Sequence, residues 1–308
     1  MIAGLPEVVA KPGLPPEVTI WEVGARDGLQ NEPGTIATDT KIELINRLAA
    51  AGLPVVEATS FVRPDWVPQL ADAAEVMAGI TRSSLTRYPV LVPNTHGLER
   101  ALQAGASDVA VFASATQTFA RKNLNCDLGQ QMERFEPTVA AARAAGARVR
   151  GYVSMCFGDP WEGQVAVGDV ISVCEELTAV GCEELSLGDT IGVATPGQVQ
   201  RLLADLSGSV PLEAVGVHFH NTYGQALSNT YASLEAGVRT IDASAGGLGG
   251  CPYAKSATGN LATEDLVWML TGLGVRTGVD LEQLVATSVW LAGILDRPSP
   301  SAVVRALS

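Results

Sequence analysis

The chain has 308 residues, of which 47% are hydrophobic and 17% are charged, and its formal net charge is −13 at pH 7. It lacks the uncharged apolar run of roughly 18 residues that a membrane helix needs, and the composition is typical of a folded globular protein. No cluster of Lys and Arg offers a basic face, which argues against a nucleic-acid partner. An anionic substrate must be attracted by local positive charges, against the field of the whole molecule.

Cysteine usage and the chain ends predict a cytoplasmic protein. The first 20 residues show no basic, apolar leader pattern, and the last three are not a peroxisomal signal. The five cysteines form no CxxC pair and are odd in number, so reduced thiols are expected. They are Cys126, Cys156, Cys174, Cys182 and Cys251.

Short β-branched runs alternate with Ala/Leu/Glu-rich stretches from about residue 18 to residue 246. The expected strands are 18–24, 54–60, 88–94, 108–114, 149–155, 183–189, 214–220 and 240–246. The expected helices between them are 40–52, 97–106, 134–147, 168–181 and 231–238. Several of these helices end at a glycine that suits a C-terminal cap.

This alternation predicts a single domain over residues 1–308, built as a (β/α)₈ TIM barrel. The barrel is expected over about 18–261, and additional C-terminal helices over about 262–308. Strand counting leaves a doubly wound open sheet as an alternative. Polar motifs at the end of strand after strand favour the barrel, because barrel active sites lie at the carboxyl ends of the strands.

Two of the three histidines, His218 and His220, are two residues apart at the end of the seventh expected strand. Residues i and i+2 of a strand point to the same face, so the two imidazoles can share a metal ion. Asp27 follows the first strand and Asn260 follows the last, and both offer oxygen ligands. A mixed nitrogen and oxygen set suits Mg²⁺ or Mn²⁺ better than tetrahedral Zn²⁺. The remaining histidine, His96, is expected at a helix start.

Charged residues at other strand ends have two readings each. Arg26 can belong to a surface ion pair with Asp27, or it can be a fixed guanidinium that faces developing negative charge. Glu57 and Asp189 can cap helices or solvate strand ends, or they can orient the arginine or a ligand histidine.

The segment 246–260 is rich in glycine, but it lacks the G-x-G-x-x-G spacing and the early position of a dinucleotide site, and no Walker motif is present. A mobile loop is the better account, because glycine permits the backbone changes that closure requires. Cys251 lies in this loop between Gly-Gly and Pro. A thiol with an ordinary pKa of roughly 8.5 is protonated at neutral pH and can donate its proton.

Five stretches carry a resemblance to a known family. They are EVGARDGLQNE, EATSFVRPDWVPQ, LGDTIGVATPG, HFHNTYGQALSNT and GGLGGCPYAKSATGNLATEDLV. Together they resemble the hydroxymethylglutaryl-CoA lyases, from about residue 16 to residue 295. The resemblance implies a metal-dependent TIM barrel and retro-Claisen cleavage of 3-hydroxy-3-methylglutaryl-CoA (HMG-CoA) to acetyl-CoA and acetoacetate.

The resemblance also implies roles for individual residues. Arg26 would steady the enolate oxygen of the departing acetyl-CoA, and Cys251 would protonate its carbanion. Glu57 and Asp189 would be supporting acids, and Gln30 would be a polar neighbour of the substrate. The base that removes the hydroxyl proton stays open between Asp27 and His218. The implied metal ligands are Asp27, His218, His220 and Asn260.

The chain departs from the family pattern at a few positions. Many members read HCHDTYGQ where this chain has Phe219 and Asn221, so an acid is missing near the metal and Asn221 is expected beside the substrate. Met155 replaces a frequent cysteine in the fifth-strand loop. A longer 3-hydroxy-3-alkylglutaryl-CoA is therefore an alternative substrate. The expected contacts to the CoA phosphates are Arg121, Lys122 and Lys255.

Two other functions are alternatives to the lyase. A condensing synthase of the same superfamily would share the metal site, but such enzymes usually carry long C-terminal regions and lack the cysteine loop. A non-catalytic barrel would be expected to have lost some of the site residues. A homodimer is expected, with a place in leucine degradation, ketogenesis or another pathway.

Overall fold

The computed structural model describes residues 4–250 and 259–308, so Cys251 and Lys255 lie outside the described residues. All strands pair in parallel in one sheet, in the order β2-β1-β9-β8-β7-β6-β5-β4-β3. The strands are β1 (Thr19–Glu22), β2 (Val55–Val56), β3 (Thr59–Ser60), β4 (Val90–Leu91), β5 (Asp108–Ser114), β6 (Arg148–Ser154), β7 (Glu184–Asp189), β8 (Val215–Phe219) and β9 (Thr240–Ala243).

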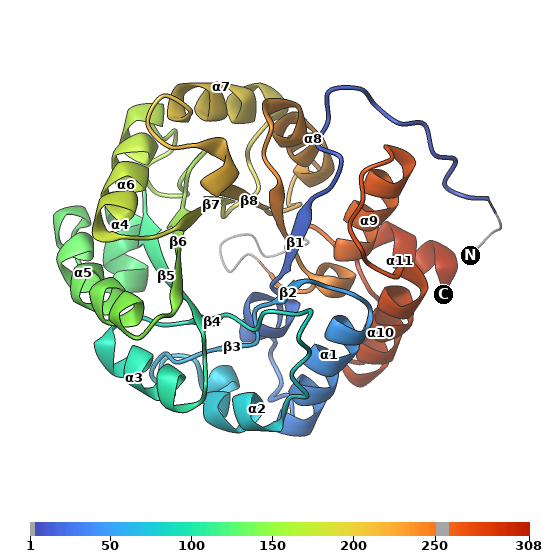
Figure 1. Ribbon diagram of the computed structural model, residues 1–308, viewed down its shortest axis with the longest axis horizontal. Helices are drawn as coiled ribbons and strands as arrows, with labels where there is room; N and C mark the ends of the chain where they lie inside the picture. The colour runs from blue at the N-terminus through green and yellow to red at the C-terminus, as the bar shows by residue number, and fades with distance from the viewer. Residues whose placement is uncertain (1–3, 251–258) are drawn as a thin grey trace.

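The sheet closes on itself through one segment of the chain. The expected strand 54–60 is divided into β2, which pairs with β1, and β3, which pairs with β4. Between them the N–H of Glu57 donates to the carbonyl of Glu22, and the N–H of Ala58 to that of Pro89, at 2.8 and 2.9 Å. The ring of strands in Figure 1 is therefore a closed barrel, which confirms the TIM barrel and excludes the open sheet.

Helices surround the barrel (Figure 1). They are α1 (Thr38–Ala50), α2 (Ala73–Gly79), α3 (Thr95–Gln103), α4 (Gln117–Phe119), α5 (Leu128–Ala144), α6 (Val167–Val180), α7 (Pro196–Leu206) and α8 (Ala226–Ala236), followed by α9 (Thr263–Gly272), α10 (Leu281–Ile294) and α11 (Ala302–Leu307). The helices α2, α4 and α7 are not among the five predicted between the strands. Gly181 and Gly237 end α6 and α8 with φ of 108° and 101°, the left-handed conformation expected of capping glycines.

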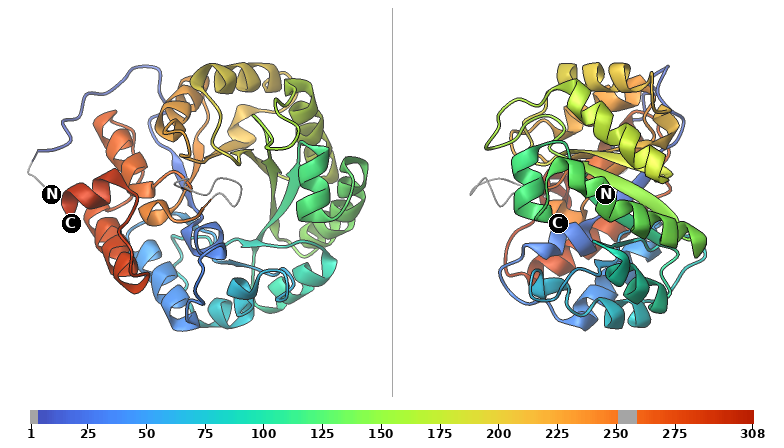
Figure 2. Two further views of the ribbon diagram at one scale, coloured as in Figure 1. Left: turned by 180° about the vertical axis from the view of Figure 1, so that it is seen from behind. Right: turned by 90° about the vertical axis from the view of Figure 1, so that its left-hand side faces the viewer.

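The last three helices, α9 to α11, lie together on one side of the barrel, next to α1 (Figures 1 and 2). This agrees with the additional C-terminal helices expected after residue 262. Two short helical turns matter for the site: η1 (Gly24–Gly28) follows β1, and η5 (Ala245–Gly247) follows β9. None of the helices in the described part of the chain combines the length and hydrophobicity needed to span a bilayer.

Candidate active site

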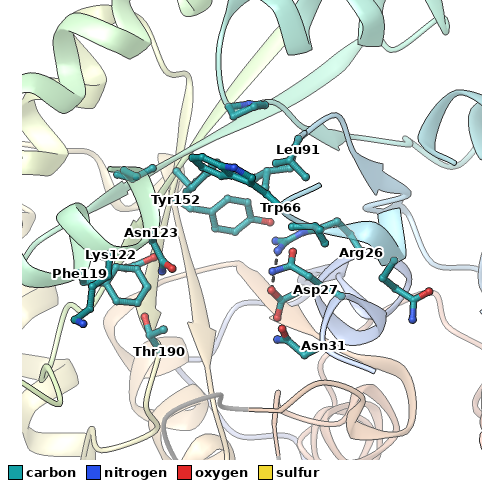
Figure 3. Close-up of a pocket in the computed structure, with 18 of the residues that line it drawn as sticks. Arg26, Asp27, Asn31, Trp66, Leu91, Phe119, Lys122, Asn123, Tyr152 and Thr190 are labelled. Carbon is teal, nitrogen blue, oxygen red and sulfur yellow. Dashed lines mark hydrogen bonds and ion pairs between the residues drawn. The ribbon is translucent and has the colours of Figure 1, made fainter. Parts of the chain in front are cut away.

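A cavity of about 920 Å³ opens at the carboxyl ends of the strands. Asp27, His218 and His220 line it, together with Arg26 and Tyr152. Figure 3 shows Arg26 and Asp27 on one side of the cavity and Lys122 and Phe119 on the other, with Tyr152 between them. The position fits a TIM barrel, whose active sites form where the loops after the strands meet.

Three potential metal ligands come together in this cavity. One ligand atom each of Asp27, His218 and His220 lies within 4.8 Å of the others. The two imidazole rings have centroids 5.3 Å apart, as expected for alternate residues at the end of β8. The intervening Phe219 points away into the core, where its ring lies 6.2 Å from that of Phe157. The shared face of the two imidazoles is the one predicted from their spacing in the sequence.

Asn260 completes the set from a distant part of the chain. It forms an isolated β-bridge with His220, and its Nδ2 donates to Asp27 Oδ2 at 2.9 Å and to the Leu248 carbonyl at 3.1 Å. Its buried Oδ1 has no hydrogen-bond partner among the described residues, and neither has Nδ1 of His220. Buried polar atoms without partners are costly. A divalent cation bound by these residues would satisfy them, so the residues present fit such an ion.

His218 is held by a residue that was not predicted from the sequence. Its Nδ1 lies 3.2 Å from Asp242 Oδ2, which leaves Nε2 for a metal. Asp242 also accepts hydrogen bonds from Arg150 Nη2 at 2.8 Å and from Ser186 Oγ at 2.9 Å. The only signal in the sequence was an aspartate inside a strand that should be buried, where a lone carboxylate needs a partner.

Ionisation favours cation binding. Burial alone would raise the pKa of Asp27, but Arg26 and the two histidines hold it well below its usual range. Burial and the neighbouring His218 lower the pKa of His220 to about 4. Burial opposes the charge of His218, but Asp242 outweighs it and raises the pKa. Asp27 is therefore ionised and His220 is neutral at pH 7, which are the forms that bind metals.

Arg26 is buried and fixed between two carboxylates. Its Nε donates to Glu57 Oε1 and its Nη1 to Asp27 Oδ1, both at 2.7 Å. Glu57 also accepts hydrogen bonds from Tyr152 and from Trp21 Nε1. Arg26 is therefore a buried guanidinium held in a fixed position, and Glu57 is one of the two carboxylates that hold it.

The contacts of Asp189 are those of a capping residue. Its carboxylate accepts the backbone N–H groups of Val193 and Ala194 at 2.9 and 3.0 Å, so it caps the loop after β7. Burial raises its pKa to about 6, against these hydrogen bonds. The contacts of Asp189 therefore serve the loop rather than Arg26.

The residues expected to contact the substrate or its phosphates lie at different places around the cavity. Gln30 lines the cavity. Oδ1 of Asn221 accepts the N–H of Ala226 at 3.2 Å, so this amide serves the start of α8. Arg121 and Lys122 line the outer part of the cavity, where Arg121 pairs with Asp127 at 2.6 Å.

His96 and Met155 are not among the described residues that line the cavity. His96 lies exposed on α3, as expected. Met155 is buried with a positive φ of 63°, and its N–H donates to Thr190 Oγ1 at 2.9 Å.

A closed (β/α)₈ barrel with two histidines, a carboxylate and an amide at its mouth defines an enzyme of the metal-binding TIM-barrel class. The HMGL-like family model matches residues 17–290, and the chain belongs to this family.

The similar proteins, by sequence and by structure, are named as hydroxymethylglutaryl-CoA lyases. The mitochondrial hydroxymethylglutaryl-CoA lyase of Rattus norvegicus is 52% identical over 293 residues, covering 95% of this chain and 90% of that protein. The crystal structure of hydroxymethylglutaryl-CoA lyase from Pseudomonas aeruginosa has a TM-score of 0.94 at 48% identity, covering 96% and 98% of the two chains. An HMG-CoA lyase from Acinetobacter baumannii, in complex with coenzyme A and 3-methylmalate, has a TM-score of 0.91 at 38% identity and covers 97% of each chain.

Proposed function

We propose that this protein is a divalent-metal-dependent lyase that cleaves HMG-CoA to acetyl-CoA and acetoacetate. The observation that carries the proposal is the cluster of Asp27, His218 and His220 beside the fixed Arg26. Relatives also support the proposal, because proteins named as this lyase are about 50% identical to the chain over nearly its whole length. The coenzyme A complex of one relative supports an acyl-CoA substrate.

Asp27, His218, His220 and the Oδ1 of Asn260 would hold the ion, for which Mg²⁺ and Mn²⁺ fit the donor set. Such an ion polarises substrate oxygens as a Lewis acid.

The reaction breaks the C2–C3 bond, and the electron pair moves into the thioester as an enolate. Arg26 is placed to stabilise that charge, because its pairs with Glu57 and Asp27 do not use Nη2. The proton of the tertiary hydroxyl passes to Asp27 or to His218. Cys251, which lies outside the described residues, then protonates C2.

A longer branched substrate is the second candidate. Leu91 and Tyr152 form an apolar cluster with Ala110 inside the barrel, and Phe112 packs against it. Leu91, Phe112 and Tyr152 line the cavity, so an apolar wall is available to a substituent on C3.

Partners and location are further proposals. Arg121 and Lys122 would contact the CoA phosphates at the outer part of the cavity. A homodimer and a cytoplasmic location, with a role in leucine degradation, stay predictions. Relatives are named both mitochondrial and cytoplasmic.

The test is a coupled acetoacetate assay with HMG-CoA, run with Mg²⁺, with Mn²⁺ and with EDTA. We expect release that requires the metal and falls by at least about 10²-fold in Cys251→Ala, a typical loss for a general acid. Cys174→Ala is the matched control, because Cys174 is buried in the core on α6. Absence of release with either metal would contradict HMG-CoA as substrate and favour a longer 3-hydroxy-3-alkylglutaryl-CoA thioester. Release in EDTA would contradict the metal.

A further inference from the structure

Glu22 is a completely buried carboxylate to which the mechanism above assigns no role. It is the last residue of β1, two residues before the start of η1. Its Oε1 accepts the N–H groups of Gly24 and Ala245, both at 2.8 Å, and its Oε2 accepts the hydroxyl of Thr263 at 2.6 Å. Three donors from three segments thus converge on one side chain.

Each of these segments carries part of the site. Gly24 begins η1, which contains Arg26 and Asp27. Ala245 begins η5, which leads to Leu248, whose carbonyl accepts Nδ2 of Asn260. Thr263 begins α9, three residues after Asn260. Glu22 therefore joins the turn that supplies Asp27 to both supports of Asn260.

The packing around this carboxylate leaves little freedom. A Cβ on Gly24 would lie 2.6 Å from Glu22 Oε1, and a Cβ on Gly28 would lie 2.8 Å from Cβ of Leu248. Only glycine at both positions allows η1 to pack directly against the segment after β9. The hydrogen bonds of Glu22 thus join two segments that pack too closely to shift relative to each other.

We propose that Glu22 is a positioning residue of the metal centre, whose carboxylate sets the distance between Asp27 and Asn260. The inference rests on the proposed function only in taking these two residues as ligands. Glu22 touches neither the ion nor the substrate, and it acts through backbone groups and Thr263.

The positioning role of Glu22 depends on its hydrogen bonds and not on its negative charge. In Glu22→Gln the amide oxygen can accept both N–H groups, and the amide nitrogen can donate to Thr263. In Glu22→Ala three buried donors lose their acceptor. Thr263→Val removes one link with little change of volume, whereas Thr263→Ser keeps it.

The experiment measures Mn²⁺ affinity from the free Mn²⁺ signal in electron paramagnetic resonance, well below the unfolding temperature of each variant. We expect Glu22→Ala and Thr263→Val to weaken binding by about tenfold, as changes around metal ligands do. Glu22→Gln and Thr263→Ser should bind within about twofold of wild type. If Glu22→Ala does not fold, the comparison of Thr263→Val with Thr263→Ser tests the proposal.

Asp108→Ala is the matched control. Asp108 is also buried, but it is the first residue of β5, at the end of the strand opposite the site, where its carboxylate accepts hydrogen bonds from Arg87 Nη1 and Ser107 Oγ. Its removal should lower the melting temperature and leave Mn²⁺ affinity unchanged. Wild-type affinity in folded Thr263→Val and Glu22→Ala would overturn the positioning role. A wild-type protein that binds no Mn²⁺ would overturn the metal-dependent function instead.

Discussion

The charged side chains at this site form buried pairs of opposite charge. Arg26 is held by Glu57 and Asp27, and Arg150 is held by Asp242 at 2.8 Å, with Glu184 at 3.3 Å. Isolated charges would be expensive in such an interior, and pairing makes them tolerable while fixing their orientation. Asp242 matters most for the metal because it joins Arg150 to His218.

Asp242→Asn is predicted to weaken Mn²⁺ binding by about 10-fold to 100-fold. The amide keeps the shape but loses the charge that orients His218 with Nε2 toward the ligand site. The measurement is a Mn²⁺ titration of the purified variant, combined with a melting curve to establish that it is folded.

Ser186→Ala is the control for this prediction, because Ser186 donates to Asp242 without touching His218. It should bind Mn²⁺ within about threefold of wild type. Equal affinity of wild type and Asp242→Asn would show that Asp242 does not organise the ligand.

Short elements after the strands give the site its shape. The turn η1 is a single π-helical turn, in which the N–H groups of Arg26, Asp27 and Gly28 all point to the carbonyl of Val23, at 2.8 to 3.1 Å. Isolated π-helical turns often mark functional sites because they place adjacent side chains in unusual directions. Here the turn presents Arg26 and Asp27 to the same cavity.

Elements far from the cavity should affect stability alone. Asp280 caps α10 by accepting the N–H groups of Glu282 and Gln283 at 3.0 and 3.1 Å. Asp280→Ala is predicted to reduce the free energy of unfolding by about 1 kcal/mol, the usual effect of losing an N-cap. Urea unfolding measures the loss, and the rate of acetoacetate release should not change. A large loss of activity in the folded variant would contradict this assignment.

The whole barrel brings together residues that are remote in sequence. Asp27 and Asn260 are 233 positions apart and share a hydrogen bond of 2.9 Å. The net charge of −13 also makes the local cations of the cavity important, since the molecule as a whole repels an anionic acyl-CoA.

Buried carboxylates between the barrel and the C-terminal helices predict the pH dependence of stability. Burial raises the pKa of Glu264 from 4.5 to about 8 and that of Glu22 to about 7. The folded state therefore binds more protons than the unfolded state above about pH 4.5, and the free energy of unfolding falls as pH rises to about 8.

Glu264→Gln should flatten part of this decline, because an amide does not titrate. Urea unfolding of both proteins at a series of pH values between about 5 and 9 measures the slopes. Parallel slopes would contradict an elevated pKa of Glu264 in the folded state.

Local sequence patterns determined the order of strands and helices, because strand and helix periods and capping glycines are properties of neighbouring residues. They also predicted that His218 and His220 share a face, since a strand alternates. The division of 54–60 into β2 and β3 and the contacts of Asp189 and Asn221 depended on barrel closure and packing. The hydrogen bonds accepted by Asp242 and Glu22 also depended on barrel closure and packing. These contacts join segments far apart in the chain, and only the closed barrel decides which buried donor meets which carboxylate.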